Sequence, residues 1–378
     1  MSLSVLFDHQ AFDGQIFGGI SRYITELSRA LSKEQSCRVK VISPIYINQY
    51  LKNYRNEIQI NGFPMLPIRG ARRLASFINE AVSPRLIERE SADILHVTGY
   101  RPSLANHGFR ARVVSVYDMT FEKFPQYFGN AELASQQKRH AVTSADHIIC
   151  ISKSTQKDLI QEFGVDENRT SVVHLAASLT KHSLQRRSTE ERPFFLHVGG
   201  RWGYKNFSSL LLAYRMSKSL QDAADIVCFG GEINYSSELK EIKKLGLSSE
   251  RIRFIRGSDV DLSSLYQRAI CLVYPSKYEG FGLPLLEAMS CGCPVMCSAT
   301  SSMPEVCGDG AWYVDVDDAD SIRLAMEKML NCAEEREQLI LAGNVRSGKF
   351  SWGRCAEETI LAYEVALRKM DDPRIATL

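Results

Sequence analysis

The sequence predicts an α/β protein with two doubly wound domains, each built around a parallel sheet. In both halves of the chain, apolar strand-like segments alternate with segments of helical periodicity, which is typical of this class. A polar stretch with few large apolar residues, Ser183–Pro193, separates the two series. The length of 378 residues also favours two hydrophobic cores over one. We therefore expect an N-terminal domain over residues 1–185 and a C-terminal domain over residues 190–350.

Composition and cysteine usage are those of a soluble protein from a reducing compartment. Hydrophobic residues make up 44% of the chain and charged residues 24%, and no apolar run is long enough to span a membrane. The N-terminus has no basic segment followed by a cleavage site, so no signal peptide is expected. The ten cysteines fall mostly in apolar runs, and Cys291-x-Cys293 has no partner pair at zinc spacing. We therefore expect a cytoplasmic protein with buried free thiols.

The net charge of +2 conceals a difference between the two halves. Residues 1–189 carry 24 basic and 17 acidic side chains, a net +7, whereas the remainder carries 22 and 27, a net −5. A basic half can meet a nucleic acid, an anionic membrane or a phosphorylated substrate. The chain has no nucleic-acid-binding motif, so we expect no nucleic acid partner.

One segment of the N-terminal half combines helical periodicity with clustered arginines. Leu74, Phe77, Ile78 and Ala81 repeat at the spacing of one helix face, and arginines gather at the start of the segment. The simpler interpretation is an amphipathic helix that packs this apolar face against the core. The alternative is a patch that contacts anionic lipid head groups, which would place the protein at the inner face of the cell membrane.

The most informative stretch lies in the C-terminal half. An apolar strand, Cys271–Tyr274, is followed by a glycine-rich turn, Glu279–Gly282, and by a helical segment, Leu283–Met289. The first amides of a helix have no intrahelical partners, and the glycines let an anion approach the backbone. Glu279 and Glu287 can accept hydrogen bonds from sugar hydroxyls, so the loop suits a ligand with central phosphates and flanking sugars. The alternative is an ordinary turn with two solvated acids.

A second loop of the C-terminal half places two cations beside backbone amides. The strand Phe194–Val198 leads into a glycine-rich loop that carries Arg201 and Lys205, and the helical run Phe207–Leu220 follows. Two fixed positive groups at the end of a strand can stabilise a leaving pyrophosphate. The alternative is an exposed loop decorated with basic side chains.

The N-terminal half has related features at the ends of its expected strands. The strand Leu3–Phe7 is followed by a Gly-Gly pair ending at Gly19 and by a helix, which again can admit an anion near a helix N-terminus. Further strands are expected at Arg38–Ser43, Asp93–Val97, Arg112–Val116 and Asp146–Ser152. His96, Tyr117 and Asp118 then lie at strand ends, where α/β sheets bind ligands. A lone histidine at such a position is more often a hydrogen-bonded structural residue.

These motifs resemble those of the retaining glycosyltransferases of family 4, which have the GT-B fold. Glu279 and Glu287, eight positions apart, match the paired glutamates of the family, and Gly199–Asn206 is similar to its arginine–lysine string. Phe17–Tyr23 looks like its first glycine loop. The resemblance implies two Rossmann-like domains that face a central cleft, with a C-terminal helix at 352–370 completing the first. The N-terminal domain would bind the acceptor and the C-terminal domain the nucleotide sugar.

The resemblance also implies a role for each candidate residue. Glu279 would contact the hydroxyls of the transferred sugar, Glu287 the ribose, and Arg201 with Lys205 the diphosphate. The expected catalytic residues are Glu279, Arg201, Lys205 and Asp118, and the expected donor contacts are Glu287, Gly280, Phe281, Gly282, Leu283 and Gly19. No metal and no cofactor are expected, because the nucleotide sugar is itself the co-substrate.

The N-terminal half departs from the family pattern at two positions. Thr98 stands where many members carry a cleft histidine, and Tyr117 replaces the histidine of a His-Asp pair. Asp118 is therefore the first candidate for the polar contact to the sugar. His96, Thr98 and Tyr117 are further candidates for contact with the sugar or the acceptor.

Within the family, Gly18–Tyr23, Tyr117–Met119 and Gly203–Phe207 look most like bacterial mannosyl- or rhamnosyltransferases of surface-polysaccharide assembly. This likeness implies GDP-mannose as the donor and an oligosaccharide or polyprenyl-diphosphate-linked sugar as the acceptor. Two other functions stay open, a sugar-nucleotide 2-epimerase of the same fold and an inactive relative acting as a scaffold or sensor. Asp259-x-Asp261 invites a divalent-metal site, but Asp261 precedes a helical run and is better explained as a helix N-cap.

Overall fold

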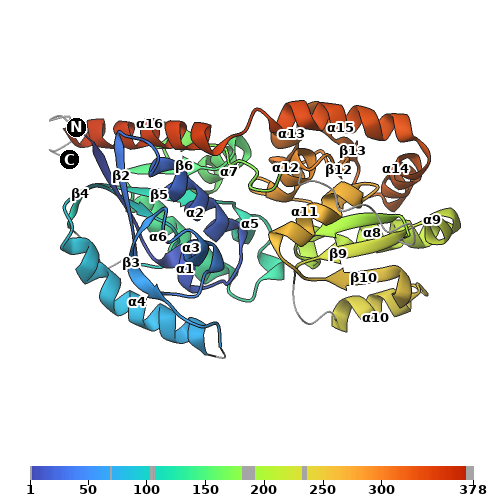
Figure 1. Cartoon of the computed structure of the whole chain (residues 1–378), viewed down its shortest axis with the longest axis horizontal. Helices are drawn as coiled ribbons and strands as arrows, with labels where there is room; N and C mark the ends of the chain where they lie inside the picture. Colours follow the sequence, from blue (N-terminus) through green and yellow to red (C-terminus); the bar gives the residue numbers. More distant parts are fainter. Residues whose placement is uncertain are drawn as a thin grey trace. The chain divides into compact units, whose positions relative to one another are not determined.

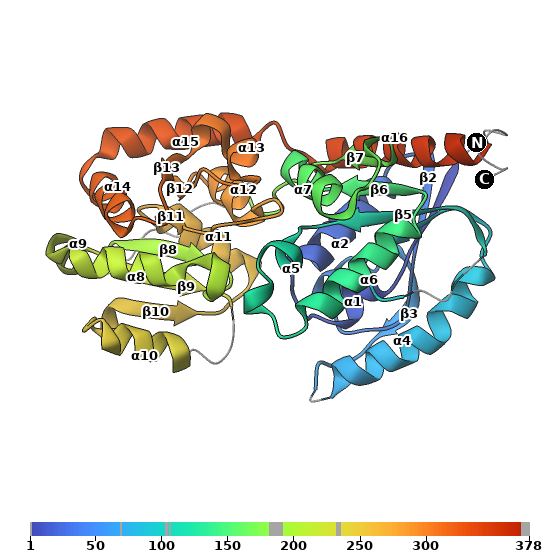
Figure 2. The same cartoon turned by 180° about the vertical axis from the view of Figure 1, so that it is seen from behind.

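The computed structural model of the chain describes residues 2–68, 70–102, 105, 107–180, 192–231 and 236–371. The chain divides into two compact units, one formed by Met1–Leu175 with Ser351–Leu378 and the other by Ala176–Phe350. Figures 1 and 2 show the elements of both units from opposite sides. The polar linker expected at Ser183–Pro193 lies outside the described residues, apart from its last two positions.

The first unit is built on a seven-stranded sheet in which all neighbouring strands are parallel. The strand order is β3-β2-β1-β4-β5-β6-β7, so the order of the chain reverses between β1 and β4. Ligands of such sheets bind beyond the carboxyl ends of the strands at this reversal. The strands are β1 (Leu3–Phe7), β2 (Cys37–Tyr46), β3 (Gln59–Pro64), β4 (Ala92–Val97), β5 (Phe109–Val116), β6 (His147–Cys150) and β7 (Thr170–Val172). The α-helices are α1 (Gln10–Asp13), α2 (Gly19–Leu31), α3 (Gln49–Asn53), α4 (Ala71–Glu88), α5 (Thr120–Lys123), α6 (Ala131–Thr143), α7 (Lys153–Phe163) and α16 (Trp352–Asp371).

Helix α2 packs as its hydrophobic spacing predicts. Tyr23, Ile24, Leu27 and Leu31 are all fully buried, while Ile20 in the first turn is partly exposed. Burial of one large apolar side chain contributes roughly 1.5–3 kcal/mol. This face therefore holds the helix on the sheet.

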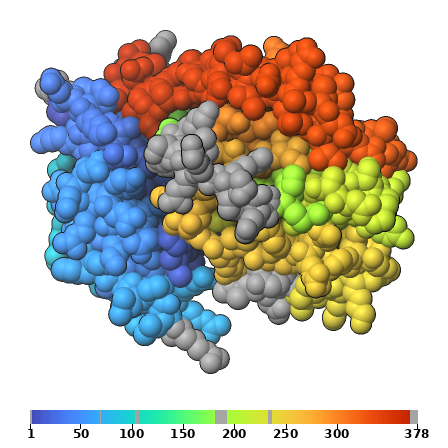
Figure 3. Space-filling model, turned by 45° about the vertical axis from the view of Figure 1, so that its right-hand side comes forward, coloured from blue at the N-terminus to red at the C-terminus, as the bar shows by residue number. Residues whose placement is uncertain are grey.

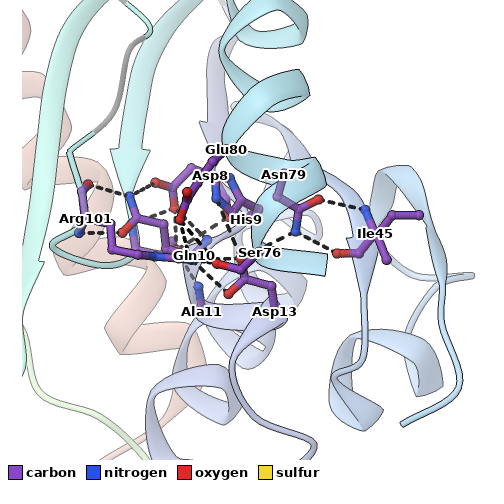
Figure 4. Close-up of polar contacts among 11 residues, drawn as sticks. Asp8, His9, Gln10, Ala11, Asp13, Ile45, Ser76, Asn79, Glu80 and Arg101 are labelled. Atoms are coloured by element: carbon purple, nitrogen blue, oxygen red, sulfur yellow. Dashed lines mark hydrogen bonds and ion pairs between the residues drawn. The ribbon is translucent and has the colours of Figure 1, made fainter. Parts of the chain in front are cut away.

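Helix α4 buries a different face from the one that the apolar spacing predicts. Its buried residues are Ala71, Ala75, Asn79, Ser83 and Ile87. Leu74 and Phe77 are instead 51% and 73% exposed, and the light-blue residues of this region lie on the surface in Figure 3. The packing of Leu74, Phe77 and Ala81 against the core is therefore a wrong prediction. Polar contacts determine which face is buried. The Asn79 side chain forms two hydrogen bonds, of 2.7 and 2.9 Å, with the backbone of Ile45 in β2, and these bonds turn Asn79 toward the sheet (Figure 4).

The last helix of the chain, α16, belongs to the first unit, where it contacts α2, β5 and β6. Figure 1 shows α16 running beside α2. The hydroxyl of Tyr363 lies 2.6 Å from Nδ1 of His96 in β4, and the ring of Trp352 stacks near that of Tyr23. A segment from the end of the chain thus completes the core of the N-terminal sheet.

The second unit repeats the same plan with a six-stranded parallel sheet. Its order is β10-β9-β8-β11-β12-β13, so the reversal falls between β8 and β11. The strands are β8 (Phe194–Val198), β9 (Asp225–Phe229), β10 (Ile252–Ile255), β11 (Leu272–Tyr274), β12 (Val295–Ser298) and β13 (Trp312–Val314). The α-helices are α8 (Phe207–Met216), α9 (Lys218–Ala223), α10 (Ser236–Lys244), α11 (Asp259–Arg268), α12 (Leu283–Ser290), α13 (Met303–Cys307), α14 (Ala319–Asn331) and α15 (Ala333–Ser347).

Two local expectations about the second unit need correction. The helical run Phe207–Leu220 is two helices, because Ser217 ends α8 and caps α9 through a hydrogen bond from the amide of Leu220. Asp261 is the third residue of α11 and not its N-cap. Ser258 is the N-cap, and Asp261 accepts a 2.7 Å hydrogen bond from the Ser258 amide to complete a capping box.

Candidate active site

The two glycine-rich loops of the second unit meet at its topological reversal. One loop follows β8 and the other follows β11, and these strands are neighbours in the sheet. The Lys277 amide donates a 2.8 Å hydrogen bond to the Tyr204 carbonyl, which ties one loop to the other. Residues separated by more than 70 positions in the sequence thus share one edge of the sheet, where doubly wound proteins bind nucleotides.

At this edge, Lys205 and Glu279 form an ion pair. The Lys205 ammonium lies 2.7 Å from a Glu279 carboxylate oxygen, with the side chains 19% and 11% exposed. Burial alone would lower the pKa of Lys205, but attraction to Glu279, and to Tyr274 and Tyr204, raises it above its ordinary value. Lys205 is therefore a fixed cation throughout the neutral pH range.

The backbone on both sides of the Glu279 carboxylate is fixed by two serines that sequence reasoning missed. The Glu279 amide donates to Oγ of Ser301 at 2.9 Å, and Oγ of Ser302 donates to the Glu279 carbonyl at 2.9 Å. Ser301 has a φ of 51°, a left-handed conformation that is uncommon for a residue other than glycine. A signal was present, since the sequence places two serines just before the Met303-Pro304 helix start, but serine pairs are too common to be diagnostic.

The second glutamate lies in the helix that follows. Helix α12 begins after Gly282, whose φ of 89° suits glycine, and a Cβ there would lie 2.8 Å from the Leu285 side chain. Glu287 is only 3% exposed. Since Glu279 and Glu287 are both largely buried, the alternative of two solvated surface acids fails.

The other expected donor contacts differ in what they offer. Gly280 is buried and Leu283 partly buried, on the turn that enters α12. Phe281 is 3% exposed with its ring 6.0 Å from that of Phe350, so its side chain supports the loop from inside.

Arg201 occupies a different position from Lys205. Its Nε donates to Glu238 of α10 at 2.9 Å, and one terminal nitrogen donates to the Gly230 carbonyl at 2.8 Å. Its guanidinium also lies 5.0 Å from the centre of the Phe254 ring. The structure thus places Lys205 beside Glu279 but holds Arg201 in the end of the loop after β9. A role for Arg201 on a diphosphate would require its other terminal nitrogen or a change of rotamer.

In the first unit, His96 has a structural environment. It is fully buried inside β4, and its ring nitrogens lie 2.6 Å from the Tyr363 hydroxyl and 2.8 Å from Oγ of Ser115. Burial lowers the pKa of His96 to about 3. Both ring nitrogens are thus used within the core, and we do not propose His96 as a sugar contact.

Thr98 and Tyr117 are likewise buried and hydrogen-bonded to their surroundings. The Thr98 amide donates to the Asp8 carboxylate at 2.9 Å, and the Tyr117 hydroxyl donates to the Thr98 carbonyl at 2.9 Å. Asp118 differs, because its side chain is 38% exposed at the end of β5, with the ammonium of Lys138 at 3.9 Å. Gly19 is exposed at the first position of α2, and a Cβ there would meet no atom within 4 Å.

Comparison with known proteins gives the family. The family model described as "Glycosyltransferase Family 4" matches residues 17–181. The model described as "Glycosyl transferases group 1" matches residues 180–346. The O-antigen chain mannosyltransferase B of Escherichia coli is 30% identical over 272 residues, which cover 68% of this chain and 71% of that protein. The chain belongs to glycosyltransferase family 4.

Two further relatives of this glycosyltransferase match smaller shares of the chain and of their own length. The O-antigen chain mannosyltransferase RfbU of Salmonella typhimurium is 27% identical over 221 residues, 58% of this chain and 61% of that protein. The match to the serotype-specific mannosyltransferase WbdA of Escherichia coli spans only 30% of that longer protein.

Solved structures show the same fold. The Anabaena protein HepE in complex with UDP and glucose superposes with a TM-score of 0.71 at 16% identity, covering 96% of this chain and all of HepE. WaaG, a glycosyltransferase of lipopolysaccharide biosynthesis, gives 0.69 at 17% identity, covering 96% of this chain and 99% of its own. This glycosyltransferase therefore has the GT-B fold, with two Rossmann-like units.

The described residues contain neither a cluster of potential metal ligands nor a helix that could span a membrane. No group of three or more histidine, cysteine, aspartate or glutamate side chains comes together as a potential metal site within the described ranges. Of the helices in the described part of the chain, none has the length and hydropathy that a bilayer span requires.

Proposed function

We propose that this glycosyltransferase moves mannose from GDP-mannose to a lipid-linked saccharide acceptor, with retention of the anomeric configuration and without a metal ion. The observation that carries the proposal is the Lys205–Glu279 ion pair at the strand reversal of the second unit, followed by the buried Glu287 in α12. The choice of mannose is supported by several relatives that are named as mannosyltransferases, one of them at 30% identity.

The proposed chemistry follows from the charges at this edge. When the bond between the anomeric carbon and the diphosphate oxygen breaks, negative charge grows on the leaving phosphate. Lys205 is already a fixed cation there, and the first amides of α12 add the positive end of the helix dipole. The acceptor hydroxyl bonds to the anomeric carbon from the same face, and its proton passes to the leaving phosphate.

In this scheme Glu279 orients the sugar. One of its carboxylate oxygens pairs with Lys205, and the backbone on either side is fixed by Ser301 and Ser302. A held carboxylate can accept hydrogen bonds from sugar hydroxyls at a constant position. Glu287, at 3% exposure, would accept the ribose hydroxyls in the same way.

A transfer assay tests the proposal. We expect the full-length protein to consume GDP-mannose in preference to UDP-glucose and dTDP-rhamnose when given a polyprenyl-diphosphate-linked saccharide. Product NMR should show an α-linkage, and addition of EDTA should leave the rate unchanged. An inverted anomeric centre or a rate abolished by EDTA would contradict the mechanism, and conversion of UDP-N-acetylglucosamine without acceptor would favour the epimerase.

We also propose that the protein works at the cytoplasmic face of an anionic membrane, where such an acceptor would be found. Five large apolar side chains at the end of β3 and the start of α4 are at least half exposed, namely Phe63, Leu66, Ile68, Leu74 and Phe77. Arg72 and Arg73 are exposed in the same helix turn. Apolar anchors beside arginines suit insertion among anionic head groups. Ten free cysteines support a reducing compartment.

Vesicle co-sedimentation tests this surface. We expect binding to vesicles that contain phosphatidylglycerol and much weaker binding to pure phosphatidylcholine. Phe77→Ser should reduce binding, whereas Leu341→Ser, which changes a similarly exposed side chain on α15, should not. Equal binding of both variants would exclude α4 as the membrane contact.

A further inference from the structure

A large aromatic side chain lies exposed on the loop after β8, next to Lys205. Trp202 is 39% exposed, and no other aromatic residue in the described part of the second unit has as large an exposed fraction. Covering an exposed indole removes apolar surface from water, so an aromatic residue at the surface of a site is a candidate contact for a ligand. The sequence motifs identified Arg201 and Lys205 on this loop and gave Trp202 no role.

Trp202 is a direct neighbour of the Lys205 side chain. A Cβ built on Gly200 would lie 3.5 Å from Nε1 of Trp202 and 3.7 Å from Cγ of Lys205, so both side chains lie against the same glycine. The Lys205 amide also donates a 3.1 Å hydrogen bond to the Trp202 carbonyl. The indole is therefore held beside the lysine whose ammonium pairs with Glu279 at 2.7 Å.

Tyr204 supports the indole and connects it to the second loop of the site. The rings of Trp202 and Tyr204 meet edge to face, with their centres 5.5 Å apart and their planes at 87°, an arrangement that is favourable for aromatic pairs. The Lys205 ammonium lies 4.9 Å from the centre of the Tyr204 ring. The Tyr204 carbonyl accepts the 2.8 Å hydrogen bond from the Lys277 amide of the loop after β11. The indole thus has a defined position before a ligand binds, which lowers the entropic cost of binding.

Trp202, Lys205 and Glu279 together offer the chemistry that recognises a pyranose ring. Such a ring carries hydroxyls around its rim and C–H bonds on its faces. The Glu279 carboxylate can accept hydrogen bonds from the hydroxyls, but neither it nor the Lys205 ammonium offers an apolar surface to the C–H face. An indole offers this surface, and covering the C–H face with it stabilises the complex through the hydrophobic effect.

A nucleobase is the other planar group that can stack on an indole. Trp202 neighbours Lys205, which pairs with Glu279, and the proposed function assigns these two residues to the diphosphate and the transferred sugar. The ribose is assigned to Glu287 instead, and the base lies beyond the ribose. The position of Trp202 therefore favours a sugar ring over the base.

We propose that Trp202 is a stacking platform for a pyranose ring and a specificity-determining residue of this glycosyltransferase. The inference rests on the proposed function and deepens it, since it names the group that contacts the apolar face of the sugar. The transferred mannose and the terminal sugar of the acceptor share this chemistry, and binding and transfer measurements distinguish them.

Calorimetric titration of the full-length protein with GDP and with GDP-mannose tests the platform, because GDP-mannose adds only the sugar to GDP. We expect Trp202→Ala to weaken GDP-mannose binding by about tenfold and to leave the affinity for GDP within about twofold of the wild type. Trp202→Phe keeps a smaller aromatic ring and should recover most of the loss. Leu212→Ala, which changes a side chain that is 42% exposed on α8 of the same unit, should alter neither affinity.

Steady-state transfer assays on the same proteins show which sugar lies on the indole. Weakened binding of GDP-mannose supports the platform and identifies the transferred mannose as its ligand. Unchanged binding of GDP-mannose, with the acceptor KM of Trp202→Ala raised by about tenfold, also supports it and identifies the terminal sugar of the acceptor.

Two results would overturn the platform alone. If Trp202→Ala weakened GDP as much as GDP-mannose, the indole would stack on the base or support Lys205 and would not contact a sugar. If neither the GDP-mannose affinity nor the acceptor KM changed, Trp202 would have no ligand. Failure of the wild-type protein to bind GDP would instead overturn the proposed function.

Discussion

At the scale of single residues, the proposed donor site contains a lysine and a glutamate that form an ion pair. Lys205 and Glu279 lie 2.7 Å apart in a partly buried setting, where charged hydrogen bonds are strong. Removal of either partner leaves the other with an uncompensated charge. The effects of the two substitutions should therefore be coupled.

Lys205→Ala should slow turnover by roughly ten- to a hundred-fold, since a charged hydrogen bond contributes about 1.5–3 kcal/mol. Glu279→Ala should also slow it, and the double variant should lose less than the two single losses combined. Lys218→Ala, which removes an exposed lysine paired with Asp222 on α9, is the control and should keep wild-type rates. Steady-state kinetics of the wild type, the two single variants and the double variant measures the coupling, and strictly additive losses would show that the two residues act independently.

At the scale of elements, the loop after β9 positions Arg201. Gly230 and Gly231 both have positive φ, 77° and 73°. A Cβ on Gly230 would meet nothing within 4 Å, whereas one on Gly231 would lie 2.5 Å from an Arg201 nitrogen and 2.7 Å from the Gly199 carbonyl. Substitution of either glycine would therefore strain the backbone, but only a side chain at position 231 would also clash with Arg201 and Gly199.

Gly231→Ala should therefore destabilise the second unit more than Gly230→Ala, whose cost should be near the 1–2 kcal/mol of a strained backbone. Gly231→Ala should also weaken GDP binding, because it displaces Arg201 and the loop after β8. Urea unfolding and calorimetry of the two variants provide the comparison. Equal stability and equal affinity would mean that the contact between Gly231 and Arg201 has no functional weight.

The C-terminal helix α16 is coupled to the sheet of the first unit through one buried hydrogen bond. Tyr363→Phe removes the hydroxyl that faces Nδ1 of His96 and leaves that nitrogen without its partner. We expect a loss of about 1–3 kcal/mol in the free energy of unfolding. Tyr127→Phe changes a tyrosine that is 44% exposed and should alter stability by less than about 0.5 kcal/mol. Similar free energies of unfolding for the two variants would show that the contact between α16 and His96 does not stabilise the fold.

How far the sequence predicts each element depends on what holds it. Apolar periodicity located α2, and strand-loop-helix order located the loops after β8 and β11. Apolar periodicity predicted the wrong buried face for α4, because Asn79 and not the row of apolar residues determines which face is buried. Sequence motifs also identified Lys205 and Glu279 as candidate site residues. They could not predict the ion pair between Arg201 and Glu238, because that pair depends on the position of α10.

At the scale of the whole molecule, buried histidines make stability depend on pH. Burial lowers the pKa of His96 to about 3, and that of His147 and His197 to about 4. An exposed histidine titrates near 6.5, so between about pH 6.5 and 4 the unfolded chain binds protons that the folded chain does not. This contribution to stability is complete above about pH 6.5 and is lost as the pH falls.

Each histidine should lower the free energy of unfolding by about 1.4 kcal/mol per pH unit within that window. His96→Gln removes one titrating group, so the acid dependence of the first unit should become shallower by that amount between pH 6 and 4. Denaturant unfolding at several pH values measures the two slopes. Identical slopes for wild type and variant would mean that His96 does not carry the acid sensitivity.

The proposed function requires the second unit to bind the nucleoside diphosphate of the donor through Lys205 and Glu287. Calorimetric titration with GDP, UDP, ADP and dTDP, with and without EDTA, tests it most directly in the wild type and in Lys205→Ala and Glu287→Ala. We predict GDP-selective binding that EDTA does not change and that each substitution weakens by about tenfold or more. Binding of no nucleotide, or normal affinity in both variants, would contradict the claim.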